Sequence, residues 1–147
     1  MSLSSSGAAY WITPVKSERV KTADKIIKTL VIAHRVYRFS AKTYARHSIK
    51  TGDWICFYAN GKGVVAHARV ASEIALRIAK TMPHYPYVVK LDRLRAYLNT
   101  PILLDFQTRA KLDAFAFNLF TSNWAWLVQT TRRITKHDFE CLTSKRD

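Results

Sequence analysis

The clearest pattern of hydrophobic and polar positions is a pair of apolar runs on either side of a short polar turn near the middle of the chain. Two apolar runs, 54–59 and 64–70, flank the sequence Asn-Gly-Lys-Gly at 60–63. Asn-Gly is the strongest short signal for a β-hairpin, because both residues tolerate the positive φ values of a tight turn. The pattern therefore predicts a hairpin, and a second turn, Thr-Gly-Asp at 51–53, leads into its first strand.

The first strand of this hairpin is predicted to be central in its sheet. In an extended chain, Trp54, Cys56 and Tyr58 share one face, and Ile55 and Phe57 share the other. Because both faces are apolar, other elements should cover the strand on both sides. The return strand carries small residues that would let another element approach closely.

Weaker patterns predict the other elements. Strands are expected at 9–15, 36–39, 85–91 and 123–134, with the 36–39 segment followed by a short irregular helix. Helices are expected from an N-cap at Ser17 to about Leu30, over 105–118, and from a capping box at Thr135 and Asp138 through Leu142. The form of 73–82 stays open, and 94–104 is expected to be irregular. The pattern favours one α+β domain at 9–147, after a flexible tail at 1–8, with a strongly curved sheet or small barrel.

The charge of the chain points to a class of partner. Its 24 Lys and Arg residues against 10 Asp and Glu residues give a formal net charge of +14 over 147 residues. So large an excess on one small domain favours a polyanion as the partner. The alternative is a surface charged only for solubility, although such surfaces usually mix both signs. An apolar content of 48% excludes a disordered chain.

Cations and aromatic rings are interleaved, without any acidic residue, over 34–50. Cations neutralise phosphates and rings stack on bases, so this composition is typical of a nucleic-acid surface. The alternative is a loop whose rings fill the core while its cations are only solvated. The cations are Arg35, Arg38, Lys42, Arg46 and Lys50, and the rings are Tyr37, Phe39 and Tyr44.

Motifs for catalysis, metals or cofactors are missing from the sequence. It has no phosphate-binding glycine loop, no zinc-protease motif and few acidic residues, and its five histidines are scattered. We therefore expect a protein that is not an enzyme and needs neither metal nor cofactor. The enzymatic alternative is a small metal-independent ribonuclease built around 44–47.

Other features bear on location and on the core. Cys56 and Cys141 are expected to be buried and reduced, which favours the cytoplasm. No run of about 18 apolar residues exists, so no membrane span is expected. Two or three of the four tryptophans should be core residues, and one ring lining a pocket would suffice to stack a flipped base. These tryptophans are Trp11, Trp54, Trp124 and Trp126, and each falls in a predicted strand.

Several segments, in order, resemble the EVE family of PUA-like domains, which are relatives of the YTH readers. The family's opening Tyr-Trp strand and its pattern Val-Lys-x-Gly-Asp-x-x-x-Phe-Tyr both have counterparts here. In place of the family's Trp-x-Gly-Val, this chain has a stretch near 34–39. The matching segments are 10–12 (Tyr-Trp-Ile), 16–18 (Lys-Ser-Glu), 49–58, 63–70, 85–91 and 134–139.

The resemblance implies a PUA-like small curved β-barrel, mostly antiparallel and flanked by helices, with a pocket for a modified nucleobase flipped from its strand. The expected partner is RNA or DNA. A module that binds RNA regardless of sequence, without a base pocket, is the alternative. The pocket candidates are Trp11, Tyr37, Phe39, Tyr58 and Asn60. The candidates for phosphate contacts are Lys16, Arg35, Arg38, Lys42, Arg46 and Lys50.

Overall fold

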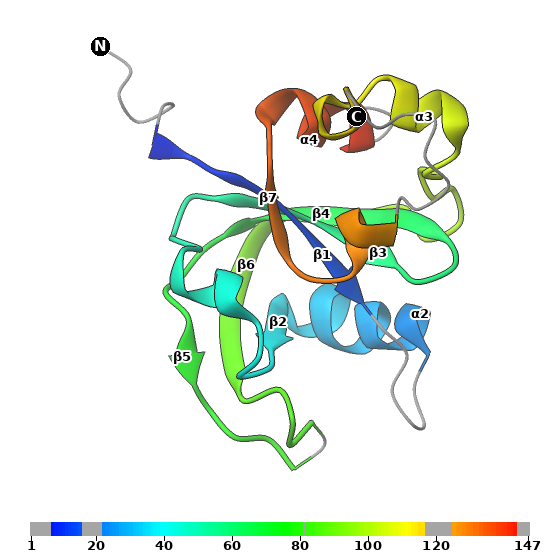
Figure 1. Ribbon diagram of the computed structural model, residues 1–147. Helices are drawn as coiled ribbons and strands as arrows, with labels where there is room; N and C mark the ends of the chain where they lie inside the picture. Colours follow the sequence, from blue (N-terminus) through cyan, green and yellow to red (C-terminus); the bar gives the residue numbers. More distant parts are fainter. Residues whose placement is uncertain (1–6, 16–21, 81, 117–124, 144–147) are drawn as a thin grey trace.

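A computed structural model describes residues 7–15, 22–80, 82–116 and 125–143. Within these ranges, seven strands form one strongly curled sheet in the order β2-β6-β4-β3-β1-β7, with β5 paired to β6 (Figure 1). Only β1 and β3 pair in parallel among the described strand pairs. The strands are β1 (Tyr10–Val15), β2 (Val36–Phe39), β3 (Trp54–Ala59), β4 (Gly63–Val70), β5 (Ala75–Leu76), β6 (Tyr87–Ala96) and β7 (Arg132–Ile134).

Short helices lie on both sides of the curled sheet, which confirms a mixed α+β fold. Figure 1 shows α3 and α4 on one side and α2 on the other. Among the described helices, none is both long and apolar enough to cross a membrane. The helices are α2 (Ala23–Ile26), the π-helix η1 (Ile27–Ile32), α3 (Phe106–Ala110), α4 (Lys136–Thr143), and the 3-10 helices η2 (Tyr44–His47), η3 (Asp113–Phe115) and η4 (Ala125–Val128).

The predicted hairpin is confirmed as β3 and β4, and β3 is central because β4 and β1 flank it. Its two faces enter different hydrophobic clusters, with Phe57 in one and Cys56 in the other. The turn differs from the expected one. The Lys62 N–H donates to the Ala59 carbonyl at 2.9 Å, and Gly61 has φ +81° while Asn60 keeps a negative φ. One positive φ at the third position is the pattern of a type II turn.

The start of β4 packs closely against the chain after β6. Val64 and Ile102 exchange two backbone hydrogen bonds of 2.9 Å. Gly63 has φ +144°, and a Cβ atom there would lie 2.5 Å from the Ile102 carbonyl oxygen. Only glycine permits both this conformation and this approach.

The predicted strand at 123–134 is wrong over most of its length. Residues 125–128 form η4, and only Arg132–Ile134 pair, with Tyr10–Ile12 of β1. Trp126 is therefore half-buried in a helix rather than in a strand, and Trp124 lies outside the described residues. The strand expected at 85–91 begins at Tyr87 and continues to Ala96, so the expected irregular segment begins later.

The helix predicted over 105–118 is confirmed only for Phe106–Ala110, because it breaks after Ala110, and residues 117–118 lie outside the described residues. Leu112 is extended, and the Asp138 carboxylate accepts the N–H groups of Asp113 and Ala114 at 2.6 and 3.0 Å. These donors would otherwise continue the helix. In the capping box, the Asp138 N–H donates to the Thr135 hydroxyl at 3.1 Å as expected, but the Asp138 side chain caps η3 instead.

At the N-terminal side, helix α2 begins after an N-cap at Thr22, whose hydroxyl accepts from the Lys25 N–H at 3.2 Å. Ser17, the expected N-cap, lies outside the described residues. Helix α4 runs to Thr143, close to the predicted end. It leaves Cys141 half-exposed, so the expectation of burial is wrong for this cysteine, whereas Cys56 is buried.

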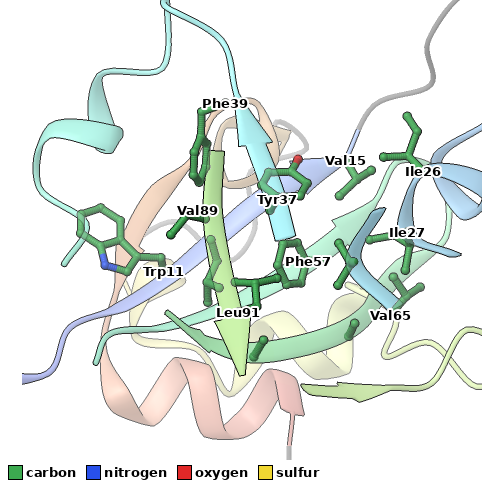
Figure 2. Packing of buried hydrophobic residues seen from close by; sticks show 14 of the residues in the cluster. Trp11, Val15, Ile26, Ile27, Tyr37, Phe39, Phe57, Val65, Val89 and Leu91 are labelled. Atoms are coloured by element: carbon green, nitrogen blue, oxygen red, sulfur yellow. The ribbon is translucent and has the colours of Figure 1, made fainter. Parts of the chain in front are cut away.

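The larger hydrophobic cluster fills the space between the sheet and α2 with η1 (Figure 2). Phe57 of β3 meets Tyr37 of β2 there, with ring centroids 5.0 Å apart. Figure 2 places Trp11 on the opposite side of this cluster from Val15 and Ile26. The cluster therefore connects both ends of β1, and its Val15 end borders the cavity described next.

Candidate functional site

A cavity of about 350 Å³ lies between the second half of β1, strand β2 and residues 40–45, and we call it the β1–β2 cavity. It exists because β7 pairs with only the first half of β1. Side chains bridge part of the gap that remains. The Tyr37 hydroxyl donates to the Pro14 carbonyl at 3.1 Å, and the hydroxyls of Thr13 and Thr131 lie 2.7 Å apart.

Two buried rings form the inner wall of the β1–β2 cavity. Tyr37 and Phe39 are 7% and 2% exposed, and their rings meet edge to face at 5.2 Å. Both belong to the hydrophobic core, so one side of each ring is already packed. Burial raises the pKa of the Tyr37 hydroxyl far above its ordinary value. The tyrosine is therefore a neutral hydrogen-bond donor at any physiological pH.

An exposed aromatic ring lies at the rim of the cavity. Tyr44, the first residue of η2, lines the cavity and is 85% exposed. Burying such a ring on a partner would remove apolar surface from water, which is favourable. Lys42 stands two residues earlier on the same rim and is also exposed. An exposed ring beside an exposed cation is a suitable pair for a base and its phosphate.

Arg38 has a structural role at the cavity wall. Its Nη1 donates to the carbonyls of Arg77 and Tyr85 at 2.7 and 3.1 Å. It thus ties Arg77 and Tyr85 to β2, and Tyr85 is part of the lining. Arg46 instead covers the ring of Tyr87, with its guanidinium carbon 3.9 Å from the ring centroid.

The remaining phosphate candidates do not gather at the cavity. Arg35 and Lys50 are exposed but are not among the lining residues, and Lys16 lies outside the described residues. Arg35 has φ +56°, directly after the helical segment. Of the cations chosen from the sequence, the structure brings Arg38 and Lys42 to the cavity.

Three of the pocket candidates lie away from the β1–β2 cavity. Trp11 is 5% exposed and its Nε1 donates to the Asp53 carboxylate at 3.0 Å. Tyr58 is buried in the hydrophobic cluster on the opposite face of the sheet, and Asn60 is exposed in the hairpin turn. Strand alternation explains why Tyr58 lies away from the cavity: as the residue after Phe57, it points to the face of the sheet opposite Phe57 and the Tyr37 ring.

Some lining residues were not chosen from the sequence. Tyr44 was part of the basic and aromatic stretch, but its position in the expected short irregular helix gave no reason to prefer it to Tyr37. Tyr85 lay at the beginning of a predicted strand. Residues 129–131 were assigned to a strand, and no local pattern placed them beside β1. Their position depends on a contact between Thr13 and Thr131, which are far apart in sequence.

A cluster of ionisable groups joins α4 to η3. Suitable ligand atoms of Asp113, His137 and Asp138 lie within 4.8 Å of one another. The cluster already makes hydrogen bonds, because Asp138 caps η3, Asp113 accepts from the Thr135 hydroxyl, and His137 Nε2 lies 2.8 Å from the Lys111 carbonyl. That hydrogen bond, aided by nearby carboxylates, raises the pKa of His137. We assign these groups to the packing of α4.

Comparison with known proteins identifies the fold of this chain but not its family. No protein-family model matches the chain, and no curated protein is similar to it. The crystal structure of protein Atu2648 from Agrobacterium tumefaciens has a TM-score of 0.58 and 18% identity, over 94% of this chain and 92% of that one.

Two further solved structures are similar. The NMR structure of Rpa0253 from Rhodopseudomonas palustris has a TM-score of 0.56 and 16% identity, over 93% of this chain and 92% of that one. A crystal structure of a protein from Pseudomonas putida has a TM-score of 0.53 and 16% identity, over 92% of this chain and 98% of that one. At these identities the likeness concerns the fold alone: the chain has the mixed α+β fold with a curled sheet that these bacterial proteins share.

Proposed function

We propose that this chain is an EVE-like, PUA-like module that binds nucleic acid and holds a modified nucleobase in the β1–β2 cavity. The observation that carries the proposal is the exposed ring of Tyr44 on the rim of a cavity of about 350 Å³. That volume lies at the lower end of the range for small-molecule sites, which suits one heterocycle rather than a large ligand. The net charge of +14 supplies the attraction for a polyanionic strand.

In this proposal each part of the cavity has a separate task. Tyr44 stacks on the flipped base and closes the cavity over it, and Tyr37 and Phe39 form the apolar inner wall. Lys42 contacts a backbone phosphate. Stacking on an aromatic side chain contributes about 1–3 kcal/mol per base, so one ring can change the affinity by up to two orders of magnitude.

The proposed module binds without catalysis. Some hydroxyls that line the β1–β2 cavity contact other oxygen atoms: Thr13 meets Thr131, and Tyr37 donates to Pro14. A metal-independent ribonuclease uses the 2′-hydroxyl of RNA as its nucleophile and needs a general base beside it, most often a histidine. No histidine is among the described residues that line the β1–β2 cavity, which favours binding over the ribonuclease alternative there.

The test compares Tyr44→Ala with Tyr44→Phe. Fluorescence anisotropy would measure binding to short single strands of RNA and DNA with one central 5-methylcytosine, 5-hydroxymethylcytosine, N6-methyladenine or unmodified base. The wild type should prefer one modified strand, by at most about two-hundred-fold where a methyl group is the only difference. Tyr44→Ala should weaken that complex by about five- to a hundred-fold. Tyr44→Phe, which keeps the ring, should not.

Phe106→Ala is the matched control. This ring is 48% exposed in α3 and is not among the residues that line the β1–β2 cavity. Its loss should leave the preference intact. Equal binding of all strands by the wild type, or an unchanged preference in Tyr44→Ala, would contradict the proposal.

A further inference from the structure

The loop between β5 and β6, described at residues 77–80 and 82–86, carries a largely exposed aliphatic side chain, and we call it the β5–β6 loop. Ile78 is 79% exposed, and among the described large hydrophobic side chains only Tyr44 is more exposed. Leu76, two residues earlier, is 63% exposed. Residues two apart in an extended segment share one side of it, so Leu76 and Ile78 form one small apolar surface.

Hydrogen bonds hold the β5–β6 loop next to the β1–β2 cavity. Arg38, which lines the cavity, donates from Nη1 to the Arg77 carbonyl at 2.7 Å. Met82 also lines the cavity, and its N–H donates to the Ala79 carbonyl at 3.2 Å. Ile78 lies between these two carbonyls in the chain. Its position is therefore fixed, through both neighbours, beside residues of the cavity wall.

The base of the β5–β6 loop is a two-stranded ribbon. The Arg77 N–H donates to the Pro86 carbonyl at 2.7 Å, which continues the pairing of β5 with β6 beyond Tyr87, where the described pairing of β6 with β2 ends. Figure 1 shows β5 and the chain after it at the lower edge of the molecule. The major groove of B-form DNA admits a two-stranded ribbon, whereas that of A-form RNA is too narrow for side chains to read. The shape of the loop therefore suits a DNA duplex.

The charges of the β5–β6 loop favour a polyanion. No acidic residue occurs in the sequence from 74 to 91. Arg77, Lys80 and His84 are all exposed. Cations around a small apolar surface can contact phosphates while the aliphatic side chains meet the bases. The sign of these charges favours a nucleic acid, rather than an apolar protein segment, as the occupant of this surface.

We propose that Ile78, together with Leu76, is a wedge that enters the base stack of a DNA duplex and fills the gap left by the base held in the β1–β2 cavity. This inference rests on the proposed function and gives it a substrate class. A base that leaves a duplex loses its pairing and stacking, which costs free energy. An aliphatic side chain in the gap restores apolar contact with the flanking base pairs, as the wedge residues of DNA-bending proteins do. In a single strand no paired stack has to be kept open, so the wedge contributes little.

The test measures, for each variant, the ratio of the affinities for a DNA duplex and for its modified single strand. The strands carry one central 5-methylcytosine, 5-hydroxymethylcytosine or N6-methyladenine and are used alone or annealed to their complements. Ile78→Ala should weaken duplex binding by about five- to fifty-fold, because apolar surface that the wedge buries is lost, and should change single-strand binding by less than about two-fold. The ratio is taken within each variant, so a general loss of affinity does not affect it.

Three further variants and an RNA duplex complete the design. Ile78→Leu keeps an aliphatic side chain and should keep the ratio. Leu103→Ala removes an aliphatic side chain that is 54% exposed and is not among the described residues that line the β1–β2 cavity, so it should change neither affinity. Lys80→Gln should lower the slope of log duplex affinity against log salt by about 0.9. RNA duplexes of the same sequences should not respond to Ile78→Ala, because the ribbon does not enter their major groove.

The outcomes separate this inference from the proposed function. If the wild type binds no modified DNA or RNA, the proposed function fails and this inference fails with it. If Tyr44→Ala weakens binding but the wild type binds no DNA duplex, or Ile78→Ala leaves the ratio unchanged, the proposed function stands and the wedge is wrong. Loss of duplex binding alone in Ile78→Ala, with the ratio kept in Ile78→Leu and Leu103→Ala, supports the wedge.

Discussion

Replacement of Asp53 by alanine should cost far more stability than replacement of a surface aspartate. The Asp53 carboxylate is 3% exposed and accepts hydrogen bonds from the Ala9 N–H, the Trp11 indole and the Lys50 N–H at 3.0, 3.0 and 2.9 Å. It thereby joins the start of β1 to the turn before β3, where Tyr10 and Trp54 are in register.

The magnitude follows from these contacts. Hydrogen bonds to a charged group contribute about 1.5–3 kcal/mol each, and a buried donor left without a partner costs about 1–3 kcal/mol. The Lys50 and Ala9 donors are near the surface and can recover water, whereas the indole of Trp11 is buried. We therefore expect Asp53→Ala to lower the free energy of unfolding by about 3–5 kcal/mol.

Urea denaturation followed by circular dichroism is the assay, and Asp105→Ala is the matched control. The Asp105 carboxylate also accepts a backbone N–H, that of Thr108 at 2.9 Å, but it is an exposed N-cap of α3. Its loss should cost about 1 kcal/mol. Asp53→Asn should also lower the free energy of unfolding, because the NH2 group of the asparagine would face N–H groups that the carboxylate accepts from. If Asp53→Ala and Asp105→Ala destabilise the protein equally, the reasoning is refuted.

Three other predictions concern the turn, the α4 packing and the rim. Gly63→Ala should lower the free energy of unfolding by at least about 2 kcal/mol more than Gly61→Ala in the same urea assay. Only at Gly63, of these two glycines, would a Cβ atom meet a backbone oxygen, that of Ile102. Equal losses in the two variants would contradict this. Folding raises the pKa of His137, so protonated His137 stabilises the folded state. This contribution to the free energy of unfolding should be complete below the unfolded pKa of about 6.5 and should be lost as the pH rises through the pKa of the folded state. Urea titrations from pH 5 to 9 should show this loss in the wild type and not in His137→Gln. Lys42→Gln should flatten the salt dependence of single-strand binding by about 0.7 in log–log slope, and an unchanged slope would remove Lys42 from the interface.

Local chemistry explains why the hairpin could be predicted from the sequence. Asn60-Gly61 specifies a turn without help from the rest of the chain, and alternation along β3 separates Phe57 from Cys56 correctly. The type of turn was less predictable, because it depends on φ at Asn60, which the adjoining strands set. The capping hydroxyl of Thr135 was likewise local, and it was found correctly.

The β1–β2 cavity could not be predicted, because it depends on contacts between distant parts of the chain. The β1–β2 cavity requires β7 to end its pairing at Ile12 and Thr131 to reach Thr13. The break between α3 and η3 similarly depends on the Asp138 carboxylate of α4, which lies 25 residues after Asp113. An apolar run such as the one at 123–128 fits a helix as well as a strand, so periodicity alone could not decide it.

The most direct test of the central claim is a map of the binding site on the protein by NMR. Backbone amide shifts would be followed while a short single strand with its preferred modified base is added to the ¹⁵N-labelled protein. We predict that the largest changes occur at residues 40–45 and 129–131, around the β1–β2 cavity. Large changes confined to other surfaces, with residues 40–45 unmoved, would contradict the claim that this cavity receives the base.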